Sequence, residues 1–238
     1  MNGRRILLTG VGRGLGHELA RQLIESGNQV WGSVRSGQPD LDLAGVLTMD
    51  LSDDAAVVAA MAELRGSSGA GAGIDGLDLV INSAGADARA FGADEQHRGP
   101  FDVDAAALNG LLAVNVTGPM VLTREALPLL RQGSNPMIVN ISSQLGSMQV
   151  AATMGRDTAY CVSKAALNML SVKSTEALKP EGIGVVMIHP GWVQTDMGGP
   201  NAALTSAESA AAVLGTIDGL TIADTGRFLT WDGRDHPW

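Results

Sequence analysis

RRILLTGVGRGLG, residues 4–16, is the stretch that decides the fold of this 238-residue chain. Its first part, Arg4–Thr9, is a short apolar run closed by glycines, which is typical of a buried strand. From Leu15 to Ser26 leucines and an isoleucine recur at helical spacing, and Gly27 is placed to cap that helix at its carboxyl end. The stretch therefore predicts a strand, a glycine loop and a helix in direct succession.

The glycines of the loop follow the spacing Thr-Gly-x-x-x-Gly-x-Gly from Thr9 to Gly16. The spacing Gly-x-Gly-x-x-Gly is not met, because its third glycine would fall at Leu15. Glycine is needed where the backbone turns tightly and where it approaches a pyrophosphate closely. The helix that follows presents free N–H groups and the positive end of its dipole to such an anion. We therefore expect a dinucleotide to bind at this loop.

Beyond this stretch, apolar runs and helical patterns alternate along the chain. Further strands are predicted at residues 29–34, 46–49, 77–81, 136–142, 184–189 and 227–231, and further helices at 53–65, 104–131, 158–179 and 206–217. Near-continuous apolar strands that alternate with helices indicate a parallel sheet covered on both faces. The expected fold class is α/β: a single Rossmann-type, doubly wound domain over residues 1–238 with a seven-stranded parallel sheet. The Gly66–Gly73 run is interpreted as a loop, not as a linker between domains.

The composition argues against several classes of protein and site. A net charge of -9 and a pI near 4.8 argue against a general surface for nucleic acid or anionic membrane. A single cysteine, Cys161, excludes an internal disulfide and fits a reducing compartment. No apolar run is judged long enough to span a bilayer and no signal peptide is recognised, so the cytoplasm is expected. No metal site is predicted, because the histidines are scattered: His17, His97, His189 and His236.

The end of the second predicted strand, SVR at residues 33–35, indicates which dinucleotide binds. An acid at this place normally binds the adenosine ribose hydroxyls, and here none occurs before Asp40. Arg35, joined by Arg13 of the glycine loop, suits a 2′-phosphate instead. We therefore predict NADP(H) over NAD(H), with Asp50 as a candidate contact to the adenine.

Tyr160 is the only tyrosine of the chain, and it precedes Lys164 by one helical turn. On a helix, positions i and i+4 lie on the same face. An ammonium group there would favour the phenolate and lower the pKa of the phenol below its ordinary value of about 10. The pair therefore predicts a proton donor that works near neutral pH.

Several motifs occur in order along nearly the whole chain: Thr9-Gly10-x-x-x-Gly14-x-Gly16, Asn82-Ser83-Ala84-Gly85, Asn115, Ile141-Ser142-Ser143, Tyr160-x-x-x-Lys164 and Pro190-Gly191. Together they resemble the motifs of the classical short-chain dehydrogenases/reductases. Within that family the chain is most similar to the carbonyl-reductase branch that includes the C-factor and sniffer proteins. The features that suggest this are GWVQTDMGG at residues 191–199, the extra residues before the tyrosine, and the closing WDG and PW. One departure is Ser83, which replaces the second asparagine of the usual Asn-Asn-Ala-Gly and so lacks its amide.

The resemblance implies a carbonyl reduction in which Tyr160 supplies the proton, while Lys164 lowers its pKa and holds the nicotinamide ribose. It also implies a catalytic serine, for which Ser142, Ser143 and Ser147 are candidates. The spacing to the tyrosine found in many relatives favours Ser147, whereas the Ile-Ser-Ser-x-x-Gly context favours Ser143. We choose Ser143, which requires a small insertion before Tyr160 of the kind that the branch resemblance supplies.

Asn115 lies in the middle of the long predicted helix and is followed by Pro119. Asparagine is a poor interior helix residue, and a proline has no N–H, so the carbonyl of Asn115 loses its helical partner. That carbonyl could hold a water that relays protons to Lys164, in agreement with the role that the resemblance implies for this asparagine. The predicted catalytic residues are Asn115, Ser143, Tyr160 and Lys164.

The predicted cofactor contacts come from the glycine loop, the ends of the following strands and the catalytic helix: Thr9, Gly10, Arg13, Gly14, Leu15, Gly16, Arg35, Asp50, Leu51, Asn82, Ala84, Gly85, Tyr160, Lys164, Pro190, Gly191, Val193 and Thr195. The Gly/Pro-rich segment at about 191–205 is predicted to be a mobile lid over the nicotinamide. Candidates to line the substrate pocket are Trp192, Met148, Met154 and Met197, and methionines suit a broad range of apolar carbonyl compounds.

The expected function is NADPH-dependent reduction of small ketones, aldehydes or quinones to alcohols. One alternative is a cofactor-bound signalling or regulatory protein of the C-factor type, and another is a specialised hydroxysteroid or polyketide-type reductase. Apolar residues on several faces of the predicted helix at 158–179 indicate a second face that needs a partner, so a homodimer or homotetramer is expected. The other expected partner is a small carbonyl or alcohol substrate, with no nucleic acid and no membrane.

Overall fold

The computed structural model describes residues 1–66, 73–93 and 98–238. His97 and most of the predicted Gly66–Gly73 loop lie outside the described residues. Within the described ranges one sheet has the strand order β3-β2-β1-β4-β5-β6-β7, and every neighbouring pair is parallel. This confirms the predicted Rossmann-type fold class. The strands are β1 (Arg5–Thr9), β2 (Gln29–Val34), β3 (Gly45–Thr48), β4 (Leu79–Asn82), β5 (Met137–Ile141), β6 (Gly184–His189) and β7 (Phe228–Thr230).

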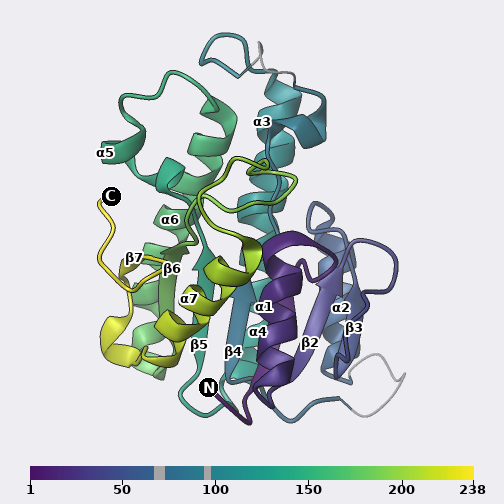
Figure 1. Cartoon of the computed structure of the whole chain (residues 1–238). Coiled ribbons are helices and arrows are strands. Elements are labelled where there is room, and N and C mark those ends of the chain that lie inside the picture. The colour runs from purple at the N-terminus through teal and green to yellow at the C-terminus, as the bar shows by residue number, and fades with distance from the viewer. Residues whose placement is uncertain (67–72, 94–97) are drawn as a thin grey trace.

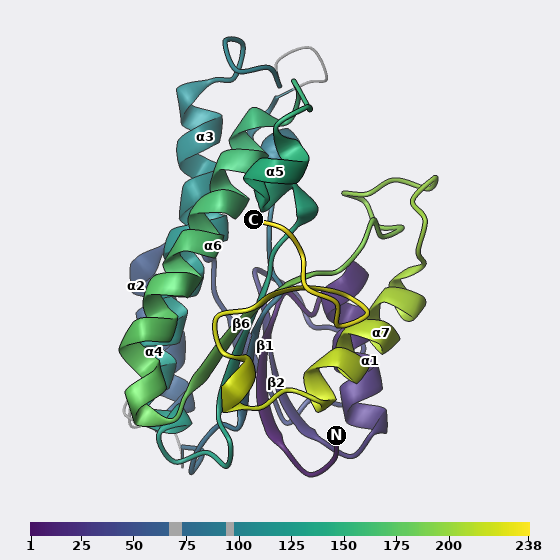
Figure 2. The ribbon, with the colours of Figure 1, turned by 90° about the vertical axis from the view of Figure 1, so that its left-hand side faces the viewer.

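Helices cover both faces of the sheet, so that the molecule has three layers (Figures 1 and 2). On one face α1 (Gly14–Glu25) packs beside α7 (Ser206–Asp218). The other face is covered by α2 (Asp54–Leu64), α4 (Gly118–Leu130) and α6 (Thr158–Leu178). Two shorter helices lie beyond the carboxyl ends of the strands: α3 (Ala105–Leu112) and α5 (Met148–Ala151).

The alternation of side chains along β1 shows how the sequence builds these layers. Ile6 and Leu8 pack into the core shared with α1 and α7, whereas Leu7 between them packs into the core shared with α2 and α4. All three side chains are fully buried. Each such side chain contributes about 1.5–3 kcal/mol when it is removed from water. An unbroken apolar run therefore suits a strand with helices on both sides.

The single helix predicted at 104–131 is divided in the structure. A π-helical turn at Ala113–Thr117 joins α3 to α4, and the N–H of Gly118 donates to the carbonyl of Ala113 across it. The combined segment Ala105–Leu130 is long and apolar enough to cross a membrane, so the prediction that no run reaches this length is wrong. Buried core helices pass the same test, and Leu122 and Leu130 are fully buried against the sheet. The cytoplasmic location stays a prediction.

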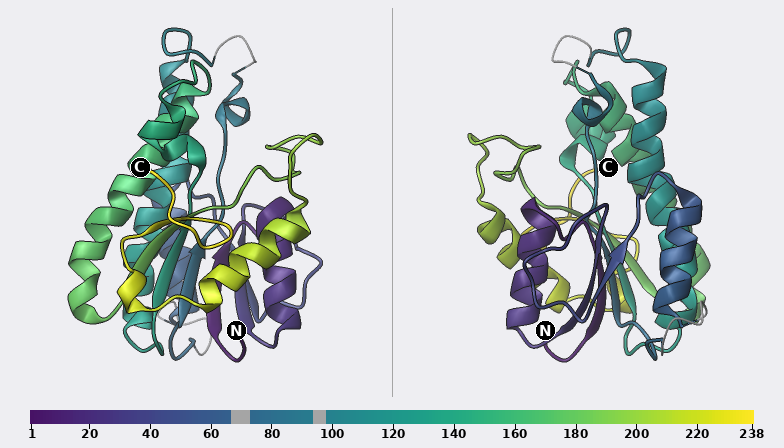
Figure 3. Two further views of the ribbon diagram at one scale, coloured as in Figure 1. Left: turned by 60° about the vertical axis from the view of Figure 1, so that its left-hand side comes forward. Right: turned by 90° about the vertical axis from the view of Figure 1, so that its right-hand side faces the viewer.

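The carboxyl ends of the strands all lie at one edge of the sheet. The strand order reverses between β1 and β4, and in open α/β sheets ligands bind at such a switch point. The segment that follows β6 rises above α1 and α7, while α5 lies across from it beyond the same edge (Figure 3). The residues at this edge therefore form the candidate site.

Candidate active site

The backbone of the glycine loop is shaped to bring a ligand close. Gly10 and Gly14 have φ angles of +80° and +59°, a region that favours glycine. A Cβ on Gly16 would lie 2.3 Å from the carbonyl oxygen of Gly10, so no side chain fits there. Helix α1 begins at Gly14 with no side-chain cap on its first N–H groups. These free donors and the uncovered backbone fit the pyrophosphate of a dinucleotide.

Thr9 connects the glycine loop to the end of β4 through hydrogen bonds. Its hydroxyl accepts the N–H groups of Ser83 and Ala84, both at 3.0 Å. A Cβ on Gly10 would lie 2.9 Å from the Cα of Ala84, so the two backbone segments touch. The Asn-Ser-Ala-Gly segment and the glycine loop are thus held side by side at the switch point of the sheet.

The two arginines predicted for the 2′-phosphate lie in different surroundings. Arg35 is exposed at the end of β2. It lies close enough to Asp50, just after β3, for its positive charge to act on that carboxylate. Hydrogen bonds from Ser52 hold the pKa of Asp50 below its ordinary value, and Arg35 lowers this pKa further. Arg13 instead pairs with Asp196 at 2.8 Å. The structure therefore brings Arg35 and Asp50 together, while Arg13 points to the lid.

Lys164 is buried at the carboxyl end of β5. Its ammonium donates to the carbonyl of Ile141 at 2.9 Å, and burial lowers the pKa of Lys164 to about 8. The ammonium lies 5.7 Å from the centre of the Tyr160 ring. The i,i+4 pair thus shares one face of α6, as the sequence predicts.

The prediction that the pKa of Tyr160 is lowered is wrong for the protein without its cofactor. Burial raises the pKa of this phenol above its ordinary value, a hydrogen bond with Ser143 partly offsets the rise, and the negative charge of Asp87 adds to it. The ammonium of Lys164 is engaged by the carbonyl of Ile141 and does not offset the burial. The phenol is therefore a protonated group at neutral pH.

Ultraviolet difference titration can test this directly, because Tyr160 is the sole tyrosine. We expect a midpoint above about 10 for the protein alone. NADP⁺ should lower that midpoint, since a positive ring beside the phenol favours the phenolate. Protein unfolded in urea is the control and should titrate near about 10. A midpoint below this value in the folded protein alone would contradict the burial argument.

Three candidate serines follow β5, and the structure gives each a different environment. Ser142 is buried and donates to the side-chain oxygen of Asn168 at 2.6 Å. Ser147 is fully buried and accepts a backbone N–H inside α5. Ser143 is partly buried, and its hydroxyl lies close enough to the phenol of Tyr160 to lower the pKa of that phenol. This arrangement supports the choice of Ser143 as the catalytic serine.

Asn115 lies inside the π-helical turn and connects two parts of the site. Its side chain exchanges two hydrogen bonds of 2.9 Å with the backbone N–H and carbonyl of Ala86. It also donates to the hydroxyl of Ser163 at 3.0 Å, next to Lys164. A Cβ on Gly85 would lie 3.3 Å from the Asn115 side-chain oxygen and 3.6 Å from the Lys164 ammonium. The Asn115 side chain and the Lys164 ammonium therefore both lie next to Gly85.

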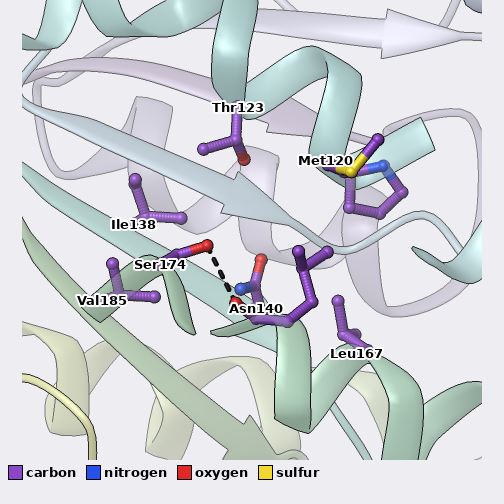
Figure 4. Close-up of a pocket in the computed structure, with 9 residues that line it drawn as sticks. Met120, Thr123, Ile138, Asn140, Leu167, Ser174 and Val185 are labelled. Atoms are coloured by element: carbon purple, nitrogen blue, oxygen red, sulfur yellow. Dashed lines mark hydrogen bonds between the residues drawn. The ribbon is translucent and has the colours of Figure 1, made fainter. Parts of the chain in front are cut away.

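A buried polar network lies beneath the end of β4. Asn82 donates to Asn140 at 2.7 Å, and Asn140 donates to Ser171 at 2.7 Å. Asn140 and Thr123 line a cavity of about 40 Å³ between α4, α6 and the sheet, which Figure 4 shows and which is large enough for water. The side-chain nitrogen of Asn82 is thus engaged, whereas its side-chain oxygen is buried and has no hydrogen-bond partner among the described residues.

The predicted lid at 191–205 folds back on itself. Gly191 has a φ of +86°, and a Cβ there would lie 2.5 Å from the side chain of Leu204. Val193 and Leu204 form a parallel bridge. A Cβ on Gly14 would lie 3.4 Å from the methyl group of Thr195. The lid therefore reaches the glycine loop at Thr195, which is one of its predicted cofactor contacts.

The side chains predicted to line the substrate pocket are exposed on two sides of the site. Met148 is 76% exposed at the start of α5, and Met154 is 45% exposed just after that helix. Trp192 and Met197, in the lid, are 53% and 40% exposed. Their exposure leaves these apolar side chains free to contact a ligand, and their role in the substrate pocket stays a prediction.

The sequence pattern of the short chain dehydrogenase family matches residues 4–204 of this chain. This chain is a short-chain dehydrogenase. It is 41% identical over 164 residues to the C-signal protein of Myxococcus xanthus, and the match covers 68% of this chain and 93% of that protein.

Two solved structures resemble this dehydrogenase over its full length. They are the NADPH-bound carbonyl reductase from chicken fatty liver and the carbonyl reductase Sniffer of D. melanogaster. Each match covers 100% of both chains at 28% identity, with a TM-score of 0.85. The resemblance to the C-factor and sniffer-like branch of the family is thus confirmed.

Proposed function

We propose that this dehydrogenase uses NADPH to reduce small ketones, aldehydes or quinones to alcohols, with Tyr160 as the proton donor. The observation that carries the proposal is the meeting of Ser143, Tyr160, Lys164 and Asn115 beside a glycine loop that fits a pyrophosphate. Family membership and the NADPH-bound carbonyl reductase neighbour support an NADP(H)-dependent oxidoreductase that acts on carbonyl groups.

The nicotinamide supplies the hydride when the cofactor is bound. The residues of the chain then donate the proton and stabilise the negative charge that develops on the carbonyl oxygen. Tyr160 is protonated at neutral pH and can donate its proton when that oxygen gains negative charge, once the bound cofactor lowers its raised pKa. Ser143, whose hydroxyl acts on the phenol, can donate a hydrogen bond to the same carbonyl oxygen. Lys164, largely protonated at pH 7 with a pKa of about 8, would hold the nicotinamide ribose of the bound cofactor beside the phenol.

A panel of small carbonyl compounds offered with NADPH tests the function. Loss of the absorbance of the reduced nicotinamide in the presence of an apolar ketone, aldehyde or quinone is the expected result. Steroid and polyketide-type ketones in the same panel separate the specialised reductases from a broad one. No turnover of any compound by protein that binds NADPH would contradict the proposed reduction.

A second candidate function is signalling by the cofactor-bound protein, which the 41% identity to the C-signal protein favours. The two functions differ in their need for the phenol. A signalling role that depends on cofactor binding alone would survive the loss of the Tyr160 hydroxyl, whereas reduction would not. Measuring both activities in one tyrosine variant therefore separates them.

The preference for NADPH should depend on Arg35. In Arg35→Ala we expect KM for NADPH to rise about 10-fold or more, because a charge-assisted hydrogen bond to the 2′-phosphate is lost, while KM for NADH changes little. Arg124→Ala, which removes another exposed arginine from α4, is the control and should change neither value. An equal rise for both cofactors would contradict this role of Arg35.

The homo-oligomer stays a prediction, with the outer face of α4 and α6 as its proposed interface. Met120, Val162 and Met169 on these helices are 43%, 43% and 58% exposed. Apolar side chains of this size on the outer face of two long helices are favourable for packing against a partner.

A further inference from the structure

Arg89, which the sequence motifs do not single out, connects two segments that flank the active site. It lies in the short 3-10 helix η1 (Ala88–Phe91), just after the Asn-Ser-Ala-Gly segment. Its Nη2 donates to the carboxylate of Asp87 and to the carbonyl of Met197 at 2.8 Å, and it shares a longer contact of 3.3 Å with the carbonyl of Asp196, both carbonyls being in the lid. The same guanidinium pairs with Asp87, with its Nε at 3.0 Å from the carboxylate. A single side chain thus spans from η1 to the lid.

The η1 end of this connection is fixed by the catalytic asparagine. Asn115 holds both backbone groups of Ala86, and Asp87 follows directly. Asp87 caps η1 by accepting the N–H of Arg89 at 2.9 Å. Asn115 therefore holds the backbone that leads into η1, from which Arg89 projects.

The ion pair that joins the lid to the glycine loop is of a weaker kind. Asp196 pairs with Arg13 of the glycine loop, and their side chains are 78% and 81% exposed. Ion pairs as exposed as this are screened by water and salt. A phosphate dianion on the cofactor would also compete with Asp196 for Arg13. The Asp87–Arg89 pair is less exposed, at 21% and 45%, and its guanidinium also binds the carbonyl of Met197 in the lid.

We propose that Arg89 is a positioning residue that holds the lid over the cofactor by binding the carbonyls of Asp196 and Met197. The predicted cofactor contacts Val193 and Thr195 come just before these carbonyls, so the bonds to Arg89 set where both contacts lie. Because Asn115 fixes the other end, the lid and the catalytic asparagine form one connected unit. The consequence for cofactor binding rests on the proposed function, whereas the attachment of the lid does not.

Hydrogen exchange of the lid amides tests the attachment in the protein alone. Gly198 donates its N–H to Thr195 Oγ1, and Gly199 donates to the Thr195 carbonyl, so both amides report on the folded lid. In Arg89→Met, which keeps the aliphatic stem, we expect both amides to exchange about 10-fold faster because the lid opens locally. Arg89→Lys keeps the charge but has a single donor group, and should protect them only in part.

Arg131→Met is the matched control. Arg131 also forms a two-bond pair with a carboxylate, that of Glu181, and is about as exposed as Arg89, but it lies at the far end of α4. Its loss should leave exchange at Gly198 and Gly199 unchanged, while both variants unfold at similar temperatures. Unchanged exchange in Arg89→Met, or faster exchange only in step with global unfolding, would overturn the proposal.

Cofactor titration gives the second arm of the test. The dissociation constant of NADP⁺ should rise about 10-fold in Arg89→Met and stay unchanged in Arg131→Met, because the lid contacts are no longer held in place. If exchange becomes faster but NADP⁺ binding is unchanged, Arg89 attaches the lid without positioning it on the cofactor, and the proposal is overturned. If neither protein binds NADP⁺, it is the proposed function that fails, and the exchange result still stands.

Discussion

Tyr160→Phe is expected to lower kcat about 10²–10⁴-fold while NADP(H) still binds. The substitution removes the hydroxyl alone and leaves the ring on α6, 5.7 Å from the Lys164 ammonium. The variant therefore loses the proton donor but keeps the shape of the site. Steady-state kinetics with the best carbonyl substrate measures the loss, and fluorescence titration with NADPH measures binding.

The result separates a catalytic phenol from a structural one. A variant that keeps more than about a tenth of the wild-type kcat would contradict the role of Tyr160, since general acids contribute far more than this. A variant that also loses NADPH affinity would show that the ring, and not the proton, matters. The thermal unfolding temperature should stay close to that of the wild type, because the packing of the ring is retained.

Gly16→Ala is the second change with a large expected effect. A methyl group there would lie 2.3 Å from the carbonyl oxygen and 2.9 Å from the carbonyl carbon of Gly10. Both are backbone atoms, so the loop has to widen to make room. We expect NADP(H) affinity to fall more than about 100-fold, since the pyrophosphate contacts rely on the loop backbone. Overpacking of this kind should also cost about 1–3 kcal/mol of stability.

Gly12→Ala is the control within the same loop. A Cβ on Gly12 would meet only a side-chain atom of Val34, at 3.6 Å, which is an ordinary contact. The backbone of Gly12 does not have a positive φ. Calorimetric titration with NADP⁺ should therefore give nearly wild-type affinity for this variant. If both variants lose affinity equally, the contact with Gly10 is not the reason for the glycine at position 16.

Regular elements were predictable where the sequence pattern is local. The predicted strands at 29–34 and 184–189 have the same bounds as β2 and β6, because each is an apolar run ended by turn residues. The long helix at 104–131 was predicted as one element, although it contains a π-helical turn around Asn115. Asparagine and Pro119 signalled an irregularity there, but the extra residue in the turn depends on how Asn115 bonds to Ala86 in another segment.

The site was predictable as a set of residues and less so as a set of interactions. The motifs named Ser143, Tyr160 and Lys164, and the structure places these side chains close together. The pairing of Arg13 with Asp196 joins residues far apart in the chain, and no pattern in the sequence indicates it. The same is true of Arg89, whose partners lie in the lid, and of the Asn82–Asn140–Ser171 network.

The sequence by itself determined the parallel sheet, the glycine loop and the types of reactive group, because periodicity and residue chemistry are properties of short segments. Only the tertiary structure decided the direction of the Tyr160 pKa and the attachment of the lid. The physical reason is that burial and charge at a site are sums over groups brought together from distant parts of the chain. A lysine one turn away can be read from the sequence, whereas the depth at which the phenol is buried cannot.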